Sequence, residues 1–189
     1  MSEVKQTRIT LKRLKVSSFA SEETLCFEAT VLLDGLPIAQ ARNDGHGGMT
    51  ILRAVTGAEA KLLIAEAFAK ALPPLITDDA DPNDPTRKLE LPMSLDFLVD
   101  LLASYEYEEK QLRTAFRRDM AKKVLFVAQG RLRYPKGVNL AILSAGDRSS
   151  LHRRIRAQHG PQTTILSELS SDEAFALWRR FVVDGEKWS

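Results

Sequence analysis

The sequence predicts an α+β fold, with an N-terminal antiparallel β-meander plus a helix, a long central helix and a C-terminal ββαβα lobe. Three observations support it: strand-type alternation near the N-terminus, helical periodicity over residues 94–122, and short strand and helix patterns that alternate after residue 123. The predicted parts are a meander and helix (1–76), an acidic proline-rich linker (77–92), the long helix (93–122) and the C-terminal lobe (123–189).

The first 42 residues contain three predicted strands: Arg8–Val16, Leu25–Leu33 and Leu36–Arg42. In the second of these, apolar residues alternate with Cys26, Glu28 and Thr30, as a strand with one buried face requires. Asp34-Gly35 follows at once, and this dipeptide supplies the positive φ angles of a two-residue hairpin turn. The resulting register places Leu33 opposite Leu36 and Val31 opposite Ile38.

A helix is predicted to begin at the capping box Thr56-Gly57-Ala58-Glu59, in which the threonine hydroxyl and the glutamate carboxylate each accept a backbone N–H. Apolar residues from Leu62 onward share one face of this helix. Pro73-Pro74 ends it just after Leu72, because proline cannot continue the hydrogen-bond ladder.

Residues 73–92 hold five of the eight prolines and four aspartates, which predicts a stiff, exposed linker or long loop. Four of its residues match ligand positions of a calcium-binding loop: Asp79, Asp81, Asn83 and Glu90. The template fails where Asp84 replaces its required glycine, and prolines stand where its flanking helices belong. A solvated acidic loop is the better interpretation.

Residues 94–122 predict one long helix, because apolar residues from Leu95 to Met120 keep near-helical spacing. Glu106 and Lys110, and likewise Glu109 and Arg113, are i,i+4 pairs of favourable orientation. Such a helix either supports both lobes or pairs with a second copy of the chain. A homodimer is therefore one of the states that we consider.

The C-terminal lobe is predicted to contain, in order, a strand at Val124–Gln129, a loop at Gly130–Gly137, a strand at Val138–Leu143, a basic helix from Ser149 to His159, a strand at Thr163–Leu166 and a helix opened by the capping box Ser170–Glu173. Gly160 follows the basic helix and is a typical residue for ending one.

The composition, 44% hydrophobic and 28% charged, is that of a globular chain of one domain or two small lobes. No apolar run reaches the ~18 residues of a membrane-spanning helix, and the N-terminus has no hydrophobic signal segment. Cys26 is the only cysteine and has no partner for an internal disulfide. We therefore expect a cytoplasmic protein without a membrane partner.

Charge is distributed unevenly along the chain. Residues 1–100 carry 11 Lys/Arg against 15 Asp/Glu, whereas residues 101–189 carry 16 against 10. The net charge of +2 therefore combines −4 in the first part with +6 in the second. A basic C-terminal part favours an anionic partner, although solvated helix faces account for the same pattern.

The most unusual local motif is Asn43-Asp44-Gly45-His46-Gly47-Gly48. Its glycines permit turns in which successive N–H groups bind an anion, and His46 beside Asp44 has the chemistry of an acid or base. The spacing matches neither a dinucleotide fingerprint nor a Walker loop. A wide hairpin loop, a partner-contact loop and catalysis by His46 are the three interpretations that remain.

Two groups of arginines on predicted helices form a second candidate site: Arg113 and Arg117 on the long helix, and Arg153, Arg154 and Arg156 on the basic helix. Arginine stripes of this kind neutralise phosphates and make binding strongly dependent on salt. Tyr134 lies between Arg133 and Lys136 and offers a ring for base stacking. No helix-turn-helix, RNP or zinc-finger pattern accompanies them.

The sequence identifies no catalytic residue, metal site or cofactor. It has no G-x-S-x-G elbow and no zinc-ligand spacing, and its three histidines, His46, His152 and His159, are far apart. An enzyme is permitted, but nothing in the chain requires one.

The stretch Ser21–Thr30 (SEETLCFEAT), together with Asp34-Gly35 and the Asn43–Gly48 motif, resembles a family of small uncharacterised proteins encoded by bacteriophages and other bacterial mobile elements. The part from Lys123 onward, with LSSDEAFALW ending at Trp178, is similar to that family more loosely. The resemblance implies a biological setting, that of a phage accessory protein, and identifies no catalytic residue. Accessory phage proteins of this size often bind host machinery, including immune complexes.

These observations lead to one main hypothesis and two alternatives. The main one is a non-enzymatic phage or mobile-element protein that binds a host protein or nucleoprotein complex, with inhibition of host defence as one outcome. The first alternative is direct nucleic-acid binding by the basic C-terminal helices. The second is a small nucleotide- or phosphodiester-directed enzyme built on the Asp44–Gly48 loop.

Overall fold

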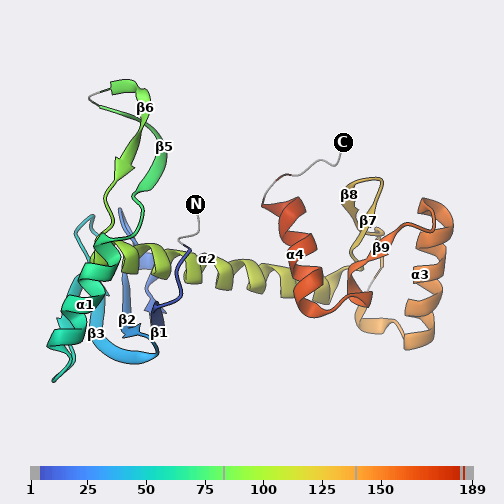
Figure 1. The fold of residues 1–189 in the computed structure, drawn as a ribbon. Helices are drawn as coiled ribbons and strands as arrows, with labels where there is room; N and C mark the ends of the chain where they lie inside the picture. Colours follow the sequence, from blue (N-terminus) through green and yellow to red (C-terminus); the bar gives the residue numbers. More distant parts are fainter. Residues whose placement is uncertain (1–4, 83, 139, 184, 186–189) are drawn as a thin grey trace. The chain divides into compact units, whose positions relative to one another are not determined.

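The computed structural model describes residues 5–82, 84–138, 140–183 and 185, and the chain folds into two compact units, 1–108 and 109–189 (Figure 1). Strands and helices are both present in each unit, which confirms the α+β class. The unit boundary falls inside the long helix α2 (Leu95–Lys122), which therefore contributes its first half to unit 1 and its second half to unit 2.

Unit 1 contains the predicted antiparallel meander. Its strands are β1 (Ile9–Val16), β2 (Phe27–Leu33), β3 (Leu36–Asn43) and β4 (Ile51–Ala54), hydrogen-bonded in that order. A 3-10 turn, η1 (Ser18–Ala20), lies between β1 and β2.

The turn between β2 and β3 forms as predicted, with positive φ angles of 49° at Asp34 and 81° at Gly35 and with Leu33 opposite Leu36. The predicted pairing of Val31 with Ile38 is wrong, because an irregularity in the ladder brings Val31 opposite Ala39. Two successive residues of β3, Ile38 and Ala39, thereby become fully buried.

Helix α1 (Glu59–Lys70) begins without the predicted capping box. Its N-cap is Ala58, which has no side-chain acceptor, and the Glu59 carboxylate instead accepts the Gly57 N–H at 3.3 Å. The Ala58 N–H donates to the carbonyl of Val55 at 2.8 Å, so a backbone turn occupies the place of the threonine cap. The apolar face is as predicted, with Ala65 and Ala69 fully buried.

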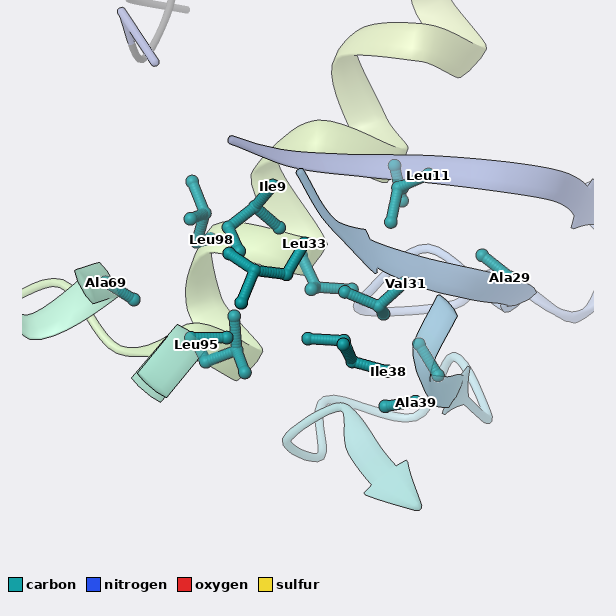
Figure 2. Packing of buried hydrophobic residues seen from close by; sticks show 14 of the residues in the cluster. Ile9, Leu11, Ala29, Val31, Leu33, Ile38, Ala39, Ala69, Leu95 and Leu98 are labelled. Carbon is teal, nitrogen blue, oxygen red and sulfur yellow. The ribbon is translucent and has the colours of Figure 1, made fainter. Parts of the chain in front are cut away.

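The core of unit 1 lies where α1 and the first half of α2 pack on the sheet. Figure 2 shows Leu95 and Leu98 of α2 close to Leu33 and Ile38 of the sheet. These side chains are 5% exposed or less, so they are the main source of hydrophobic stabilisation in the unit.

The segment predicted as a linker, 77–92, is instead part of a β-hairpin. Strands β5 (Leu75–Asp81) and β6 (Asp84–Leu91) pair antiparallel as a separate two-stranded sheet (Figure 1). In a two-stranded sheet both strands are edges, which is where a proline such as Pro85 is tolerated. An ion pair of 2.9 Å joins Lys88 to Asp78 across the hairpin.

Unit 2 has the predicted ββαβα order, built from β7 (Phe126–Ala128), β8 (Arg131–Arg133), α3 (Ala145–His159), β9 (Thr164–Ile165) and α4 (Ser171–Val182). The predicted second strand, Val138–Leu143, is wrong. Left-handed backbone at Gln129 and Gly130, with φ of 53° and 65°, turns the chain at once into β8. Leu140–Ile142 forms a 3-10 turn, η2, and Asn139 lies outside the described residues.

Helices α3 and α4, which lie wholly in unit 2, both begin at a capping box. Helix α3 starts earlier than predicted, because Ser144 and Asp147 form the reciprocal hydrogen bonds of the box. Helix α4 starts at the predicted box of Ser170 and Glu173. A 3-10 turn, η3 (Leu166–Glu168), precedes it.

The core of unit 2 has an aromatic part and an aliphatic part. Phe116 of α2 lies 5.5 Å from Phe175 and 5.7 Å from Trp178 of α4, measured between ring centres. A neighbouring cluster packs Leu151 and Ile155 of α3 on the sheet. The apolar side of α2 is thus used by the cores of both units.

Truncation of Leu98, which is fully buried, tests this account of the unit 1 core. We expect Leu98→Ala to lower the free energy of unfolding by about 2–5 kcal/mol, through reduced burial and the cavity left behind. Urea denaturation followed by circular dichroism measures it. Leu63→Ala is the control, because Leu63 is 65% exposed on α1, and equal losses in the two variants would contradict the assignment.

Candidate functional site

The Asn43–Gly48 loop is organised around the buried side chain of Asn43. Its Oδ1 accepts the Thr24 hydroxyl and the Gly45 N–H, both at 2.9 Å. Its Nδ2 donates to the Gly48 carbonyl at 3.0 Å and to the Thr50 hydroxyl at 3.1 Å. The amide therefore makes two bonds as acceptor and two as donor, and its role in this network is to fix the loop.

The backbone of Gly45 holds the loop against the segment that precedes β2. Its carbonyl accepts three N–H groups, from Glu22 and Glu23 at 3.0 Å and from Thr24 at 3.3 Å. Gly45 has a φ of +89°, and a Cβ placed there would lie 2.0 Å from the carbonyl oxygen of Ala20. Glycine is required at this position by both conformation and space.

The polar groups of the loop bond within the protein, which weakens two of the sequence-based interpretations. The Gly45 N–H is bonded to Asn43, and the Gly47 N–H donates to the Thr24 hydroxyl at 3.3 Å, so these two do not form an anion nest. Asp44 pairs with Arg42 at 2.8 Å instead of with His46.

The His46 ring lies on the surface. Its side chain is 64% exposed, and its Nδ1 is 3.2 Å from a carboxylate oxygen of Glu22, which is itself 69% exposed. An acid–base pair needs a positioned neighbour and a site that limits water. The only positioned neighbour described for His46 is the solvated Glu22 carboxylate, and the exposed ring is not shielded from water.

An open cavity of about 600 Å³ lies beside the loop within unit 1, and Asp100 of α2 is one of its lining residues. The Asp100 carboxylate accepts the Thr50 hydroxyl, which links α2 to the Asn43 network. Burial raises the pKa of Asp100, and the nearby Asp96 carboxylate acts in the same direction, while the bond from Thr50 opposes them. Asp100 was not predicted from the sequence, because nothing near it in the chain indicates this contact.

Arg113, predicted as a phosphate contact, forms ion pairs and a ring contact within unit 2. It pairs with Glu109 at 3.0 Å and with Asp172 at 3.1 Å, and its guanidinium lies 4.4 Å from the ring centre of Phe175. Its charge is thus opposed by two carboxylates and its planar group lies on an aromatic ring, so a phosphate contact by Arg113 stays a prediction that these contacts make less favourable.

Arg156 is likewise engaged. Its guanidinium pairs with Glu168 of η3, and His152 lies 3.0 Å from the same carboxylate. The hydrogen bond from Arg156, opposed by partial burial and supported by His152, lowers the pKa of Glu168. Glu168 follows Arg156 by 12 residues, so no local sequence pattern indicates this pair.

The remaining predicted arginines are exposed. Arg117 of α2 and Arg153 and Arg154 of α3 make no ion pair with any residue that the structure describes. Arg153 makes one hydrogen bond, of 3.2 Å, to the Ser150 hydroxyl. These three guanidinium groups keep their charge available to a partner.

Unit 2 carries most of the positive charge of the chain. It contains 16 Lys/Arg and 8 Asp/Glu, a net +8, whereas unit 1 contains 11 and 17, a net −6. Within the described part of unit 2, nine basic side chains are exposed without an ion pair: Lys110, Arg117, Arg118, Lys122, Arg131, Lys136, Arg148, Arg153 and Arg154.

Comparison with known proteins found no matching family, no matching curated protein and no matching solved structure. Over the residues described, no group of His, Cys, Asp and Glu side chains is arranged to hold a metal ion, and Asn83 of the calcium-loop pattern lies outside that part of the chain. No helix in the same part has the length and apolar character needed to cross a bilayer.

Replacement of Gly45 tests the role of the loop backbone. We expect Gly45→Ala to destabilise unit 1 by about 2 kcal/mol or more, because alanine disfavours the left-handed conformation and its Cβ meets the Ala20 carbonyl. Chemical denaturation measures the loss. Gly48→Ala is the matched control, since a Cβ there meets nothing within 4 Å, and a comparable loss in both variants would refute the assignment.

Asp100→Asn tests the buried carboxylate. Because the pKa of Asp100 is raised in the folded protein, ionisation of this carboxyl group lowers the free energy of unfolding at pH values above that pKa. This loss of stability disappears as the pH falls through the raised pKa toward the ordinary pKa of aspartate, where the group is protonated in both states. The amide oxygen still accepts the Thr50 hydroxyl, so we expect the variant to be more stable than wild type at neutral pH and the difference to shrink in acid. Denaturation at several pH values measures this.

Glu108→Gln is the control for that experiment, because it removes one charge from an exposed position of the same helix. We expect it to change stability by less than about 0.5 kcal/mol. An Asp100→Asn variant that is less stable than wild type at neutral pH would contradict the interpretation of Asp100.

Proposed function

We propose that the chain is a non-enzymatic binding protein that attaches to the nucleic acid of a nucleoprotein complex through exposed cations of its C-terminal unit. The observation that carries the proposal is the set of nine exposed, unpaired Lys and Arg side chains in the described part of unit 2. Displacing counterions from phosphates is the main source of affinity for a protein with such a surface.

Nucleic acid fits these cations better than an acidic protein does. They come from α2, β8 and α3, as well as from the segment after β8, so they suit a ligand that presents charge continuously along its length. Six of the nine are arginines, whose planar groups donate two hydrogen bonds to one phosphate. The 49% exposed Tyr134 adds a ring on which a base can stack.

Unit 1 supports a division of roles. Its net charge of −6 disfavours contact with phosphates, so binding to nucleic acid is assigned to unit 2 alone. The Asn43–Gly48 loop contributes no reactive group to the proposal, because its buried amide and glycine N–H groups are bonded within the protein.

The resemblance of the N-terminal motifs to phage and mobile-element proteins supports the biological part of the proposal. It favours a host nucleoprotein complex as the target, with inhibition of host defence as the form of action that we consider first. Such complexes operate in the cytoplasm, which is where we place the protein.

Removal of two free arginines tests the proposal. We expect Arg153→Ala with Arg154→Ala to weaken binding of DNA or RNA and to reduce the slope of log affinity against log salt by about 0.7–0.9 for each phosphate that the variant no longer neutralises. Fluorescence anisotropy with a labelled oligonucleotide at several salt concentrations measures both quantities.

Lys61→Ala with Lys70→Ala is the matched control, because it removes the same charge from exposed positions on α1 of unit 1. We expect this control to bind like wild type. An affinity that does not change with salt, or an equal loss in the two double variants, would exclude the proposal.

A further inference from the structure

The C-terminal unit contains a second feature, an open cavity of about 560 Å³ lined by residues of β7, β8, the segment after β8 and the end of α3. We call it the Arg133 cavity. Phe126 and Ile155 give it buried apolar lining, at 3% and 5% exposure. Its volume is within the range of small-molecule sites, about 300–1,000 Å³.

The charged groups of the Arg133 cavity are cations. Arg133 and Lys136 both line it, and none of its lining residues is an aspartate or glutamate. The Nε of Arg133 is buried and has no hydrogen-bond partner in the described part of the protein. Its Nη2 makes only a long bond, 3.4 Å, to Gln129. The half-buried guanidinium of Arg133 is therefore short of acceptors, and an anionic oxygen bound in the cavity would supply one.

Aromatic groups accompany these cations. Tyr134 lines the cavity with half of its surface exposed, and the Lys123 Nζ lies 5.0 Å from its ring centre. The His159 ring, also lining the cavity, lies 5.0 Å from the ring centre of Phe126. A planar ring beside cations is the arrangement that recognises a base together with its phosphate.

We propose that the Arg133 cavity binds one nucleotide, with its phosphate on Arg133 and Lys136 and its base against Tyr134. This inference deepens the proposed function and rests on it where the nucleotide belongs to a single-stranded nucleic acid. A free mononucleotide presents the same chemistry, so the test includes both sources.

The experiment is a titration of the full chain, followed by NMR and by calorimetry, with four probes: a 5′-mononucleotide, the corresponding nucleoside, inorganic phosphate and a short single-stranded oligonucleotide. We expect saturable binding of the mononucleotide, with shifts at the Tyr134 and Lys136 amides. The nucleoside and inorganic phosphate should each bind at least about tenfold more weakly, because each lacks one of the two interacting groups.

Three variants locate the site. Arg133→Ala and Lys136→Ala should each reduce mononucleotide affinity by about tenfold, and Lys136 keeps the test valid if the Arg133 variant folds poorly, because its side chain is exposed. Lys61→Ala is the control: it removes one positive charge from an exposed position on α1 of unit 1, and Lys61 neither lines the cavity nor belongs to the nine cations of unit 2. Its mononucleotide affinity should equal that of wild type.

The outcomes separate this inference from the proposed function. Saturable mononucleotide binding that weakens about tenfold in Lys136→Ala supports the cavity, even if the oligonucleotide binds no better and the proposed function fails. An oligonucleotide that shifts the Tyr134 amide when the mononucleotide does not supports it for the single-stranded source. The inference is overturned if neither probe shifts these amides, or if Lys61→Ala and Lys136→Ala reduce mononucleotide affinity equally. Salt-dependent oligonucleotide binding would then leave the proposed function standing.

Discussion

Burial of the apolar side of α2 is the interaction on which both units depend. The first half of this 28-residue helix supplies Leu95, Leu98 and Val99 to the core of unit 1. The second half supplies Phe116 to the aromatic cluster of unit 2. Because most helix stability in proteins comes from packing, the length of α2 is explained by the two cores that it serves.

The elements that could be predicted are those in which apolar residues recur at a regular spacing over many residues. The alternation that begins at Leu25 and the helical spacing from Leu95 onward each mark one buried face. Phe27, Ala29 and Val31 of β2 are buried as that alternation predicts, although Leu32 on the other face is buried too. Strand β8 could not be predicted, because its three residues, Arg131–Arg133, are too few to show an alternating pattern. Their strand conformation follows from the turn before them. The β5–β6 hairpin was missed for a related reason: prolines and aspartates tolerated on edge strands look like a linker in sequence.

The candidate site shows a different limit of sequence reasoning. Five arginines looked equivalent, yet Arg113 and Arg156 are neutralised by Asp172 and Glu168, which are distant in the chain. Whether a charge is free depends on such long-range neighbours, and helical position alone does not reveal them. The predicted loop illustrates the same point, because the buried amide of Asn43 is recognisable as its organiser only from its hydrogen bonds with Thr24 and Thr50.

The three N–H groups that converge on the Gly45 carbonyl have a consequence for how unit 1 moves. Residues 22–24 have no regular secondary structure, and their three backbone N–H groups all donate to one oxygen of a neighbouring loop. Releasing that oxygen leaves all three donors without their acceptor, and the bond between Thr24 and Asn43 joins the same two segments. We therefore expect the two segments to open together, so that a partner that displaces one of them also loosens the other.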